Sequence, residues 1–526
     1  MTSLKSLLPT ILENERTPLV DLLLEIIQRQ EQRISDLEDE IQDLKKETKK
    51  PKFESSKMDE KTEEPPSEEK KKRTPRKNKK NLNIHNEQII QPEFIPENAR
   101  FKGYRNIVVQ DIRLSQYNTR YRLAQYQTTN GTYISAQLPE GIYNGHWGST
   151  LHRFILYQYH HQHVTQPLLL EQLHDFDIDI SSGQLSHLIT ENLTDFHQEK
   201  DQILQAGIEN ASYIQVDDTG ACHAGQKGYC THIGNEFFAW FKSTDSKNRI
   251  NFLELIHEGK PVTFIFDTES LKYMEDHKLP KWIIDKLEKS EVKISSKAVL
   301  IAYLNEAQIT QLRHQRIITE GVLMGSLLRD VVPENLAVVS DDAGQFNVFD
   351  HALCWVHAER LIHRLIPLNE EHKKALDWIR AQIWEFYRDL KAYKKASKEV
   401  QKSQKEQLKD DFNAIFQTQT SYETLNRQLK RIGKNQSELL RVLDRPELPL
   451  HNNLSESDIR DYVKKRKISG STRSENGRRS RDTFASLKKT CRKHGISFWE
   501  YLIDRISKDN LIPPLSEVIR RATCGL

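Results

Sequence analysis

The stretch VVSDDAGQFNVFDHALCWVHAERL, at residues 338–361, runs from β-branched residues into two adjacent acids, Asp341 and Asp342. The pattern predicts a short buried strand that ends in carboxylates. A second segment has the same form, because the run YIQV leads into Asp217 and Asp218 and then into a glycine-containing turn. Strands that end at one edge of a sheet can bring distant acids together, so we expect these carboxylates to meet.

The paired acids offer hard oxygen ligands of the kind that Mg²⁺ prefers. Two such ions, bridged by carboxylates, can hold the attacking and leaving oxygens of a phosphoryl displacement, and a third acid at the same edge would help. The two segments therefore predict a metal site for phosphoryl transfer. Asp218 and Asp342 are either additional ligands or turn-forming residues.

The composition sets broad limits on the protein. A chain of 526 residues is long enough for several domains, and its 37% of apolar residues can form a core. The five cysteines are few and scattered, which indicates a reducing compartment rather than a disulfide framework. Because no apolar run approaches membrane-spanning length and the N-terminus lacks a signal pattern, we expect a cytoplasmic protein that does not engage a membrane.

Residues 18–48 carry a heptad pattern. Its a positions hold Val20, Ile27, Ile34 and Ile41, and its d positions hold Leu23, Gln30, Leu37 and Leu44. β-branched residues at a with leucine at d favour a parallel two-stranded coiled coil, in which a polar d residue could fix the register. The alternative is a lone amphipathic helix that packs on its own domain.

Residues 46–84 are rich in Lys, Glu, Pro and Ser and have almost no large apolar residue, which predicts disorder. The stretch contains a basic run that includes Arg73, Arg76 and Lys77. This run is either a solvated charge cluster or an arm that binds nucleic-acid phosphates.

The next part of the chain predicts a small β-rich module followed by helices. Residues 88–140 alternate in the manner of strands, as in RNIVVQDIRL and GTYISAQL. Residues 168–189 have a helix-turn-helix rhythm, with a first helix ending near His174 and a second capped by Ser181 or Ser182. An ordinary helical hairpin is the alternative, and the second helix lacks the basic start that base reading would need.

From residue 211 the pattern changes to strands alternating with helices. The runs SYIQVDDTG, GYCTHIG and EFFAWFKST predict strands, with a hairpin turn near Gly234 and Asn235. KPVTFIFD and AVLIAYL are further apolar runs, and helical stretches lie at 269–290 and 306–330. Residues 350–445 and 453–525 are predicted to be mainly helical.

The C-terminal stretch has an uneven charge. Asn453, Glu456 and Arg460 are spaced to share one face of a helix. A run of bases follows and is opposed within the stretch only by Glu475 and Asp482, which suits a polyanion such as a nucleic-acid backbone. The candidate DNA-binding residues in this run are Lys464, Lys465, Arg466, Lys467, Arg473, Arg478, Arg479, Arg481, Lys488 and Lys489.

Taken together, the segments VDDTG, SDDAGQF, LCWVHAERL and HNNLSE resemble the insertion-sequence-sixty-six family of DDE transposases. The most specific part of the resemblance is the end of the chain. The family's residues there are matched by Arg466-Lys467, Gly477, Ser486-Leu487, Thr490, Gly495 and Tyr501-Leu502. The resemblance implies a multidomain α+β protein with a ribonuclease-H-like α/β catalytic domain that an all-α insertion interrupts.

The resemblance also implies the site and the partners. Asp217, Asp341 and Glu456 would be the catalytic residues and the ligands of Mg²⁺, with Mn²⁺ as an alternative. The substrate would be double-stranded DNA, both the element's terminal repeats and the target. A homo-oligomer of at least two subunits is implied, with accessory proteins of the same element as further partners, in the nucleoid of a bacterial cell. Two departures from the family are Ser457 in place of its arginine and His451 in place of its acid.

On this basis the chain is expected to divide into seven parts. They are a coiled coil (1–48), a charged linker (49–84), a β-rich module (85–145), a helical DNA-binding region (146–208), the first part of the catalytic core (209–349), a helical insertion (350–450) and the catalytic helix with the basic C-terminal region (451–526). The family often has a zinc knuckle before the helical region, but residues 85–150 contain no cysteine, so zinc is not implied there.

The pair Cys354 and His357 has the spacing of half a zinc site. The alternative places both residues on one face of a helix that packs in the core. Two other functions fit the same residues less completely. They are a catalytically inactive or domesticated DNA-binding relative and a ribonuclease-H-like nuclease.

Overall fold

The computed structural model describes Ile26, Arg29, Gln30 and residues 84–524, apart from 95, 97, 98, 103, 113, 140, 141, 143–145, 291 and 293. The chain divides into two compact units. The helical unit comprises Met1–Glu63, Val339–Asp342 and His351–Asn453, and the sheet unit comprises Glu64–Val338, Ala343–Asp350 and Leu454–Leu526. The predicted coiled coil, apart from those three residues, and the basic arm with Arg73, Arg76 and Lys77 lie outside the described residues.

Along the chain, groups of strands are separated by groups of helices. The strands are β1 (Gln125–Gln127), β2 (Tyr133–Ser135), β3 (Tyr213–Gly220), β4 (Tyr229–Gly234), β5 (Ala239–Thr244), β6 (Ala337–Ser340) and β7 (Asp350–Leu353). The helices before β6 are α3 (Ser149–Leu156) with the π-helical turn η3 (Tyr157–His161), α4 (Gln166–Asp175), α5 (Ser182–Thr190), α6 (Thr194–Glu209), α7 (Arg249–Ile256), α8 (Thr268–Asp276), α9 (Lys281–Glu288), α10 (Lys297–Glu306) and α11 (Leu312–Asp330). The later ones are the short η4 (Gly344–Phe346), α12 (Trp355–His363), α13 (Glu370–Lys395), α14 (Lys398–Phe416), α15 (Glu423–Gly433), α16 (Gln436–Leu439), η5 (Arg441–Leu443), α17 (Asn453–Ser469), α18 (Glu475–Lys493), α19 (Phe498–Ser507) and α20 (Leu515–Thr523).

The main sheet has the strand order β5-β4-β3-β6-β7. β3 pairs with β4 and β4 pairs with β5, both antiparallel, and Asp217 on β3 lies opposite His232 on β4. The predicted strands SYIQVDDTG, GYCTHIG, EFFAWFKST and LAVVS are confirmed, as is the hairpin turn after Gly234. The mixed α/β architecture is thus established, whereas a ribonuclease-H-like topology and the coiled coil stay predictions.

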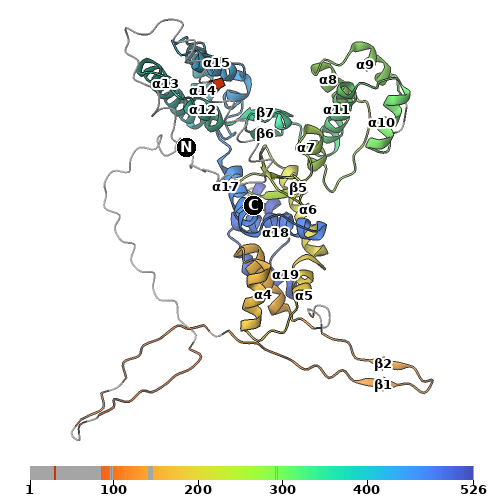
Figure 1. Ribbon diagram of the computed structural model, residues 1–526, viewed down its shortest axis with the longest axis vertical. Coiled ribbons are helices and arrows are strands. Elements are labelled where there is room, and N and C mark those ends of the chain that lie inside the picture. Colours follow the sequence, from red (N-terminus) through yellow and green to blue (C-terminus); the bar gives the residue numbers. More distant parts are fainter. Residues whose placement is uncertain are drawn as a thin grey trace. The chain divides into compact units, whose positions relative to one another are not determined.

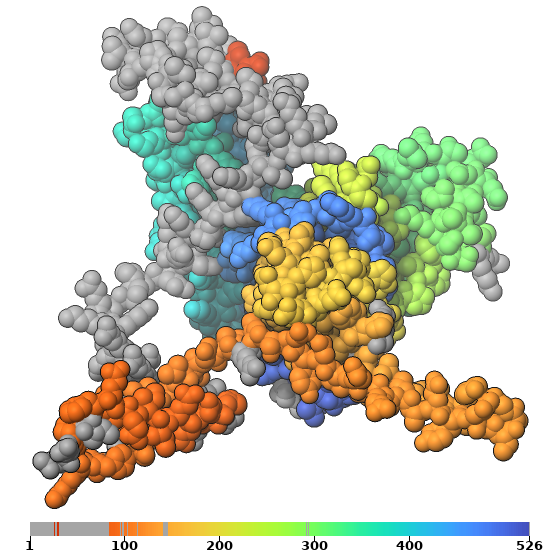
Figure 2. Space-filling model, turned by 60° about the horizontal axis from the view of Figure 1, so that its bottom comes forward, coloured from red at the N-terminus to blue at the C-terminus, as the bar shows by residue number. Residues whose placement is uncertain are grey.

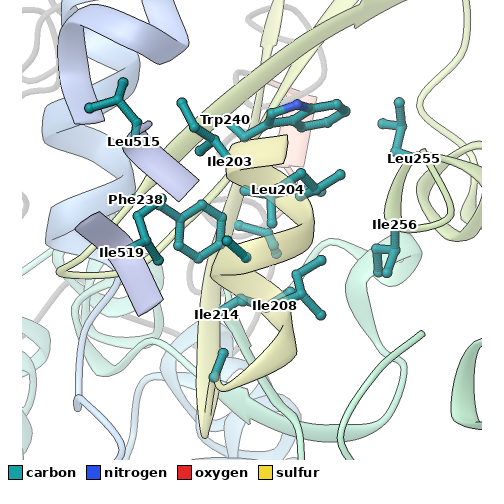
Figure 3. Packing of buried hydrophobic residues seen from close by; sticks show 14 of the residues in the cluster. Ile203, Leu204, Ile208, Ile214, Phe238, Trp240, Leu255, Ile256, Leu515 and Ile519 are labelled. Atoms are coloured by element: carbon teal, nitrogen blue, oxygen red, sulfur yellow. The ribbon is translucent and has the colours of Figure 1, made fainter. Parts of the chain in front are cut away.

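The core of the sheet unit lies between α6 and the strands. Figure 3 shows apolar side chains of α6 packed with those of β3 and of the β4–β5 hairpin, and with α7 and α20. The labelled members are Ile203, Leu204, Ile208, Ile214, Phe238, Trp240, Leu255, Ile256, Leu515 and Ile519. Chain segments that are far apart in sequence therefore share one core, which places α20 beside α6.

Helix α18 covers the outer edge of β5. Three backbone N–H groups of this strand donate hydrogen bonds to side chains of α18: Ala239 to Thr490 (3.2 Å), Phe241 to Ser486 (2.9 Å) and Ser243 to Asp482 (2.6 Å). The acceptors are spaced four residues apart, so they lie on one face of the helix. The strand's alternating N–H groups match that spacing, and the helix satisfies donors that no other strand reaches among the described residues.

Helices α4 and α5 lie where the sequence predicted two helices joined by a short turn, with α4 ending at Asp175. Ser181 caps α5, accepting a hydrogen bond from the N–H of Gln184 at 3.2 Å, while the Gln184 side chain accepts one from the N–H of Ser181 at 2.9 Å. This capping box satisfies two backbone donors at the start of the helix. The position and cap of the second helix are therefore as the sequence predicted.

The structure differs from expectation in residues 84–139. The described residues of this stretch form one short hairpin, β1–β2, and the run at 105–114 is in no strand. Its apolar side chains are exposed, with Val109 82% and Ile112 76% accessible, and the stretch forms thin projections (Figure 2). Alternating apolar residues predict a strand only where one face is buried, and here no face is.

Two apolar runs of the sheet unit are not strands either. Residues 298–304 lie in α10, where Ser296 accepts a hydrogen bond from the N–H of Val299 and so starts the helix. In the run 260–267, Phe264 forms only an isolated bridge with Ile294. A short apolar run does not by itself distinguish a strand from a helix. For residues 298–304, the N-terminal cap at Ser296 decides in favour of the helix.

Helices α12–α15 lie together in the helical unit (Figure 1), and their apolar side chains form one buried cluster that includes Trp355. The indole N–H of Trp355 donates a hydrogen bond to the carbonyl of Leu439 at 2.9 Å. The prediction that residues 350–445 are mainly helical is confirmed. Within the part of the chain described, no helix has both the length and the apolar character that crossing a membrane requires.

Candidate active site

The two acids of β3 lie on opposite faces of the sheet, and the strand continues past them to Gly220, so the prediction that it ends in the carboxylates is wrong. Asp217 is paired with His232 across the strands and Asp218 with Thr231, and successive residues of a strand alternate between faces. The Asp218 carboxylate accepts a hydrogen bond from the Thr231 hydroxyl at 2.5 Å and another from the Gln345 amide at 2.9 Å. Both oxygens of Asp218 are thus bound by neutral protein donors, which gives this acid a structural role. That Asp217 is a metal ligand stays a prediction.

Glu456 lies in the first turn of α17, and its side chain is 13% exposed. Arg460, one turn further along, has its guanidinium 3.6 Å from the Glu456 carboxylate, so the predicted common face of these two residues is confirmed. The helix continues along β3, where Arg466 donates a hydrogen bond to the Thr219 hydroxyl at 3.3 Å. Glu456 therefore belongs to a helix that is attached to the strand carrying Asp217.

The attachment is closest at Ser455, the residue before Glu456. Its backbone N–H donates a hydrogen bond to the Gln215 side chain at 3.3 Å, and its hydroxyl lies 2.5 Å from Nδ1 of His232. Nε2 of His232 lies 3.3 Å from the Asp458 carboxylate. Burial lowers the pKa of His232, and the nearby Asp458 carboxylate opposes this shift only in part.

Asp341 and Asp342 follow β6 and belong to the helical unit. The Asp342 carboxylate accepts hydrogen bonds from Arg431 at 2.7 Å and from Asn435 at 3.3 Å. Asp342, like Asp218, therefore serves as an anchor for neighbouring side chains. Ser340, before the pair, has its hydroxyl 2.8 Å from Nε2 of His351.

The three predicted catalytic acids are divided between the units, with Asp341 in the helical unit and Asp217 and Glu456 in the sheet unit. Among the residues that the structure describes, no group of three or more His, Cys, Asp or Glu side chains is arranged to hold a metal ion. The assembly of the trio around a metal therefore stays a prediction from the sequence.

The basic C-terminal stretch is not the single exposed surface that its sequence predicted. Lys464, Lys467, Arg473 and Arg479 are exposed and Arg466 is half-buried. Five further candidates for DNA contact are buried, all of them at most 9% exposed: Lys465, Arg478, Arg481, Lys488 and Lys489. The prediction that these five bind DNA directly is wrong, because a buried side chain cannot reach a phosphate backbone.

The buried bases neutralise two acids of α17 that sequence reasoning missed, Asp458 and Asp461. Lys488 lies 2.7 Å from Asp461, Lys493 lies 2.9 Å from Asp458, and Lys489 lies 3.6 Å from Asp458. Burial opposes ionisation of both carboxyls, but the adjacent histidines and lysines outweigh it, so each pKa lies well below its usual value. The available signal was their spacing, since acids three residues apart share a helix face.

Lys465 is held in a different way, against an aromatic ring. Its ammonium lies 3.5 Å from the centre of the Tyr159 ring and donates a hydrogen bond to the Tyr159 carbonyl at 2.6 Å. Burial, with Arg481 and Lys488 close by, lowers the pKa of Lys465 to about 7. This lysine joins α17 to the π-helical turn of the sheet unit.

Cys354 and His357 lie at the start of α12 in the helical unit. Cys354 is buried and precedes the helix, and its sulfur accepts a hydrogen bond from the N–H of Asn452 at 3.2 Å. Nε2 of His357 lies 3.3 Å from the Arg360 guanidinium. Cys354 therefore anchors the start of the helix, and the expectation of core packing is confirmed for Cys354, while His357 is half-buried.

Several residues of the C-terminal signature have structural roles. Ser486 and Thr490 bind the edge of β5, and the Tyr501 hydroxyl donates a hydrogen bond to the buried Glu199 at 2.8 Å. Gly495 follows α18 with φ +67°, a conformation that glycine adopts without strain at a helix end. The signature thus describes how α18 and α19 pack on the sheet unit.

Comparison with known proteins agrees with these features. Residues 337–480 match the model of a family described as "Transposase IS66 family", a range that contains Asp341 and Glu456 but not Asp217. The chain is also 39% identical over 321 residues to a protein of Sinorhizobium fredii (strain NBRC 101917 / NGR234) described as "Uncharacterized protein y4jO", which is 60% of this chain and 99% of that relative. The chain belongs to the IS66 family of transposases.

Proposed function

We propose that the protein is the DDE transposase of an insertion sequence. In this proposal it binds the element's terminal repeats, cleaves the DNA to free 3′ hydroxyls and joins them to target DNA. The observation that carries the proposal is the bridge from Asp217 to Glu456. Asp217 faces His232 across the strands, and His232 contacts the residue that precedes Glu456. Two of the three expected acids therefore belong to one connected part of the sheet unit.

The donor set fits Mg²⁺, with Mn²⁺ as an alternative, because Asp217, Asp341 and Glu456 offer only hard carboxylate oxygens. When bound, two such ions would supply an activated water or 3′ hydroxyl and neutralise charge at the leaving oxygen. The chain's own contribution is to hold the carboxylates in place. Asp218 and Asp342 are bound to other side chains and keep the ends of β3 and β6 fixed. The catalytic domain would have a ribonuclease-H-like arrangement.

DNA binding in this proposal falls to the exposed bases. Lys464, Lys467, Arg473 and Arg479 lie near the junction of α17 and α18 and are accessible. The loop between these helices is attached to the β3–β4 turn, where the N–H of Ala224 donates a hydrogen bond to the carbonyl of Thr472 at 2.8 Å. These bases form a positively charged surface that is attached to the strand carrying Asp217. Such a surface would bring a phosphate backbone close to the proposed catalytic acids.

The proposal also includes a homo-oligomer of at least two subunits, because joining two element ends requires two active sites. The predicted coiled coil at residues 1–48 would supply the association, the α4–α5 hairpin would contribute to end binding, and accessory proteins of the element would be further partners.

The decisive experiment incubates labelled element ends with wild-type protein and with Glu456→Ala in Mg²⁺. We expect the wild type to nick the ends and the variant to bind them without cleavage. Cleavage by Glu456→Ala would contradict the assignment of this acid. Binding without cleavage by both proteins would identify a catalytically inactive DNA-binding relative, and cleavage of RNA–DNA hybrids in preference to element ends would identify a nuclease.

A further inference from the structure

We propose that His232 is a positioning residue, which together with Gln215 and Ser455 sets the location of Glu456 relative to Asp217. The inference rests on the proposed function, since it concerns the same acids. We call His232, Gln215 and Ser455 the bracket. They come from β3, β4 and the first turn of α17.

The strand register places the bracket beside Asp217. His232 is the cross-strand partner of Asp217, so their side chains lie on the same face of the sheet. Gln215 is two residues before Asp217 and therefore shares that face. Gln215 and His232 are both buried, with 2% and 0% of their surface exposed. The sheet thus presents two fixed polar side chains immediately beside the predicted ligand.

Ser455 connects these side chains to the helix. The first N–H groups of a helix lack partners within it, and that of Ser455 is satisfied by the Gln215 oxygen. The Ser455 hydroxyl contacts His232, so backbone and side chain of this residue are both held by the sheet. Glu456 is the next residue in the chain after Ser455. A shift of Ser455 along the sheet would move the Glu456 carboxylate by a similar amount.

His232 is itself oriented from its other side. Nε2 of the ring faces the Asp458 carboxylate at 3.3 Å, while Nδ1 on the other side lies 2.5 Å from the Ser455 hydroxyl. Asp458 is in turn bound by Lys493 at 2.9 Å and Lys489 at 3.6 Å from α18. The bracket is therefore supported by the helix that closes the edge of β5. This accounts for the burial of Lys489 and Asp458, whose charges orient an imidazole rather than meet DNA.

The chain offers a matched control for testing the bracket. His197 contacts the Thr483 hydroxyl through Nδ1 at 2.7 Å, and both residues are buried in the same unit. This pair joins α6 to α18. The variant Ser455→Ala removes the hydroxyl from the bracket, Ser455→Thr keeps it, and Thr483→Ala removes the equivalent hydroxyl from the control pair.

The test measures Mn²⁺ binding by the loss of the free-ion paramagnetic resonance signal, together with Mg²⁺-dependent cleavage of labelled ends and thermal unfolding. We expect Ser455→Ala to weaken Mn²⁺ binding and slow cleavage by about ten- to a hundredfold, as is typical for residues that orient metal ligands. Ser455→Thr should restore both. Thr483→Ala should lower the unfolding temperature but leave metal binding and cleavage within about twofold of the wild type, because metal-site effects of that size come from residues that orient ligands.

The outcomes separate the inference from the proposed function. Wild-type Mn²⁺ binding by Ser455→Ala, equal losses in Thr483→Ala, or absence of Mn²⁺ binding by the wild type would each overturn the positioning role, whether or not DNA is cut. The proposed function fails separately if the wild type binds Mn²⁺ but cleaves no ends, or if Glu456→Ala still cleaves them.

Discussion

The ammonium group of Lys488 on α18 lies 2.7 Å from the carboxylate of Asp461 on α17, and both side chains are largely buried. The pair joins the helix that carries Glu456 to the helix that covers the edge of β5. A charge placed here has a partner within the protein, so its removal leaves a buried carboxylate with fewer cations around it rather than a weaker interaction with DNA.

The first prediction concerns this pair. Lys488→Met leaves Asp461 with one fewer cation, and we expect the free energy of unfolding to fall by about 3–5 kcal/mol. The exposed Lys464→Met should change it by less than about 0.5 kcal/mol. Urea unfolding of the two variants measures the difference. Equal, small effects would show that the buried pair contributes little to stability.

A second prediction concerns DNA affinity. Replacing Lys464, Lys467, Arg473 or Arg479 by Ala should weaken binding of element ends. It should also reduce the slope of log affinity against log salt by about 1 for each DNA phosphate that is no longer neutralised. Binding titrations between low and moderate salt give the slopes. Lys489→Met, which removes a buried base, serves as the control and should leave the slope unchanged. An unaltered slope in all four exposed variants would place the DNA-binding surface elsewhere.

The third prediction follows from Lys465, whose pKa is lowered to about 7 in the folded protein from 10.5. Between these two values the unfolded chain holds the proton and the folded chain does not, so stability rises with pH across this window. The contribution is at most about 1.4 kcal/mol for each pH unit. Lys465→Met should remove this part of the rise, as measured by unfolding between pH values of about 6.5 and 10, which span the two pKa values. The same pH dependence in the variant and the wild type would contradict a neutral Lys465.

The fourth prediction separates the two acids of β3. Asp217→Asn should abolish cleavage of labelled ends in Mg²⁺, because it removes a carboxylate charge from the proposed metal site. Asp218→Asn should retain activity, since the amide oxygen still accepts the hydrogen bond from Thr231, although the bond from Gln345 is lost. Initial cleavage rates decide between them. The reverse order of effects would make Asp218 the ligand.

The sequence predicted the features that depend on local patterns. The strand that carries Asp217 is marked by its apolar run, although it continues past the two acids to Gly220, and the start of α5 is marked by Ser181 and Gln184, so neighbouring residues carry both signals. The run at 298–304 is ambiguous in sequence, because its helix depends on the cap at Ser296 rather than on its own residues.

What the sequence could not predict depends on interactions between distant residues. The burial of Lys488 follows from its pairing with Asp461, which is on another helix, so the local charge pattern wrongly predicts an exposed side chain. Likewise, nothing near His232 in the sequence indicates Ser455, which is 223 positions away. Conversely, the run at 105–114 has the pattern of a strand, and no other described part of the chain buries its described residues.

The cover that α18 provides on β5 restricts how two copies of this protein can associate. Sheets often recruit another chain by strand addition, in which an open edge donates and accepts backbone hydrogen bonds. At this edge the N–H groups of Ala239, Phe241 and Ser243 already donate to side chains of the same molecule. A partner strand would have to displace a whole helix. In the proposed oligomer, association at this edge would therefore run through side chains or helices, because β5 is closed to a continuous intermolecular sheet.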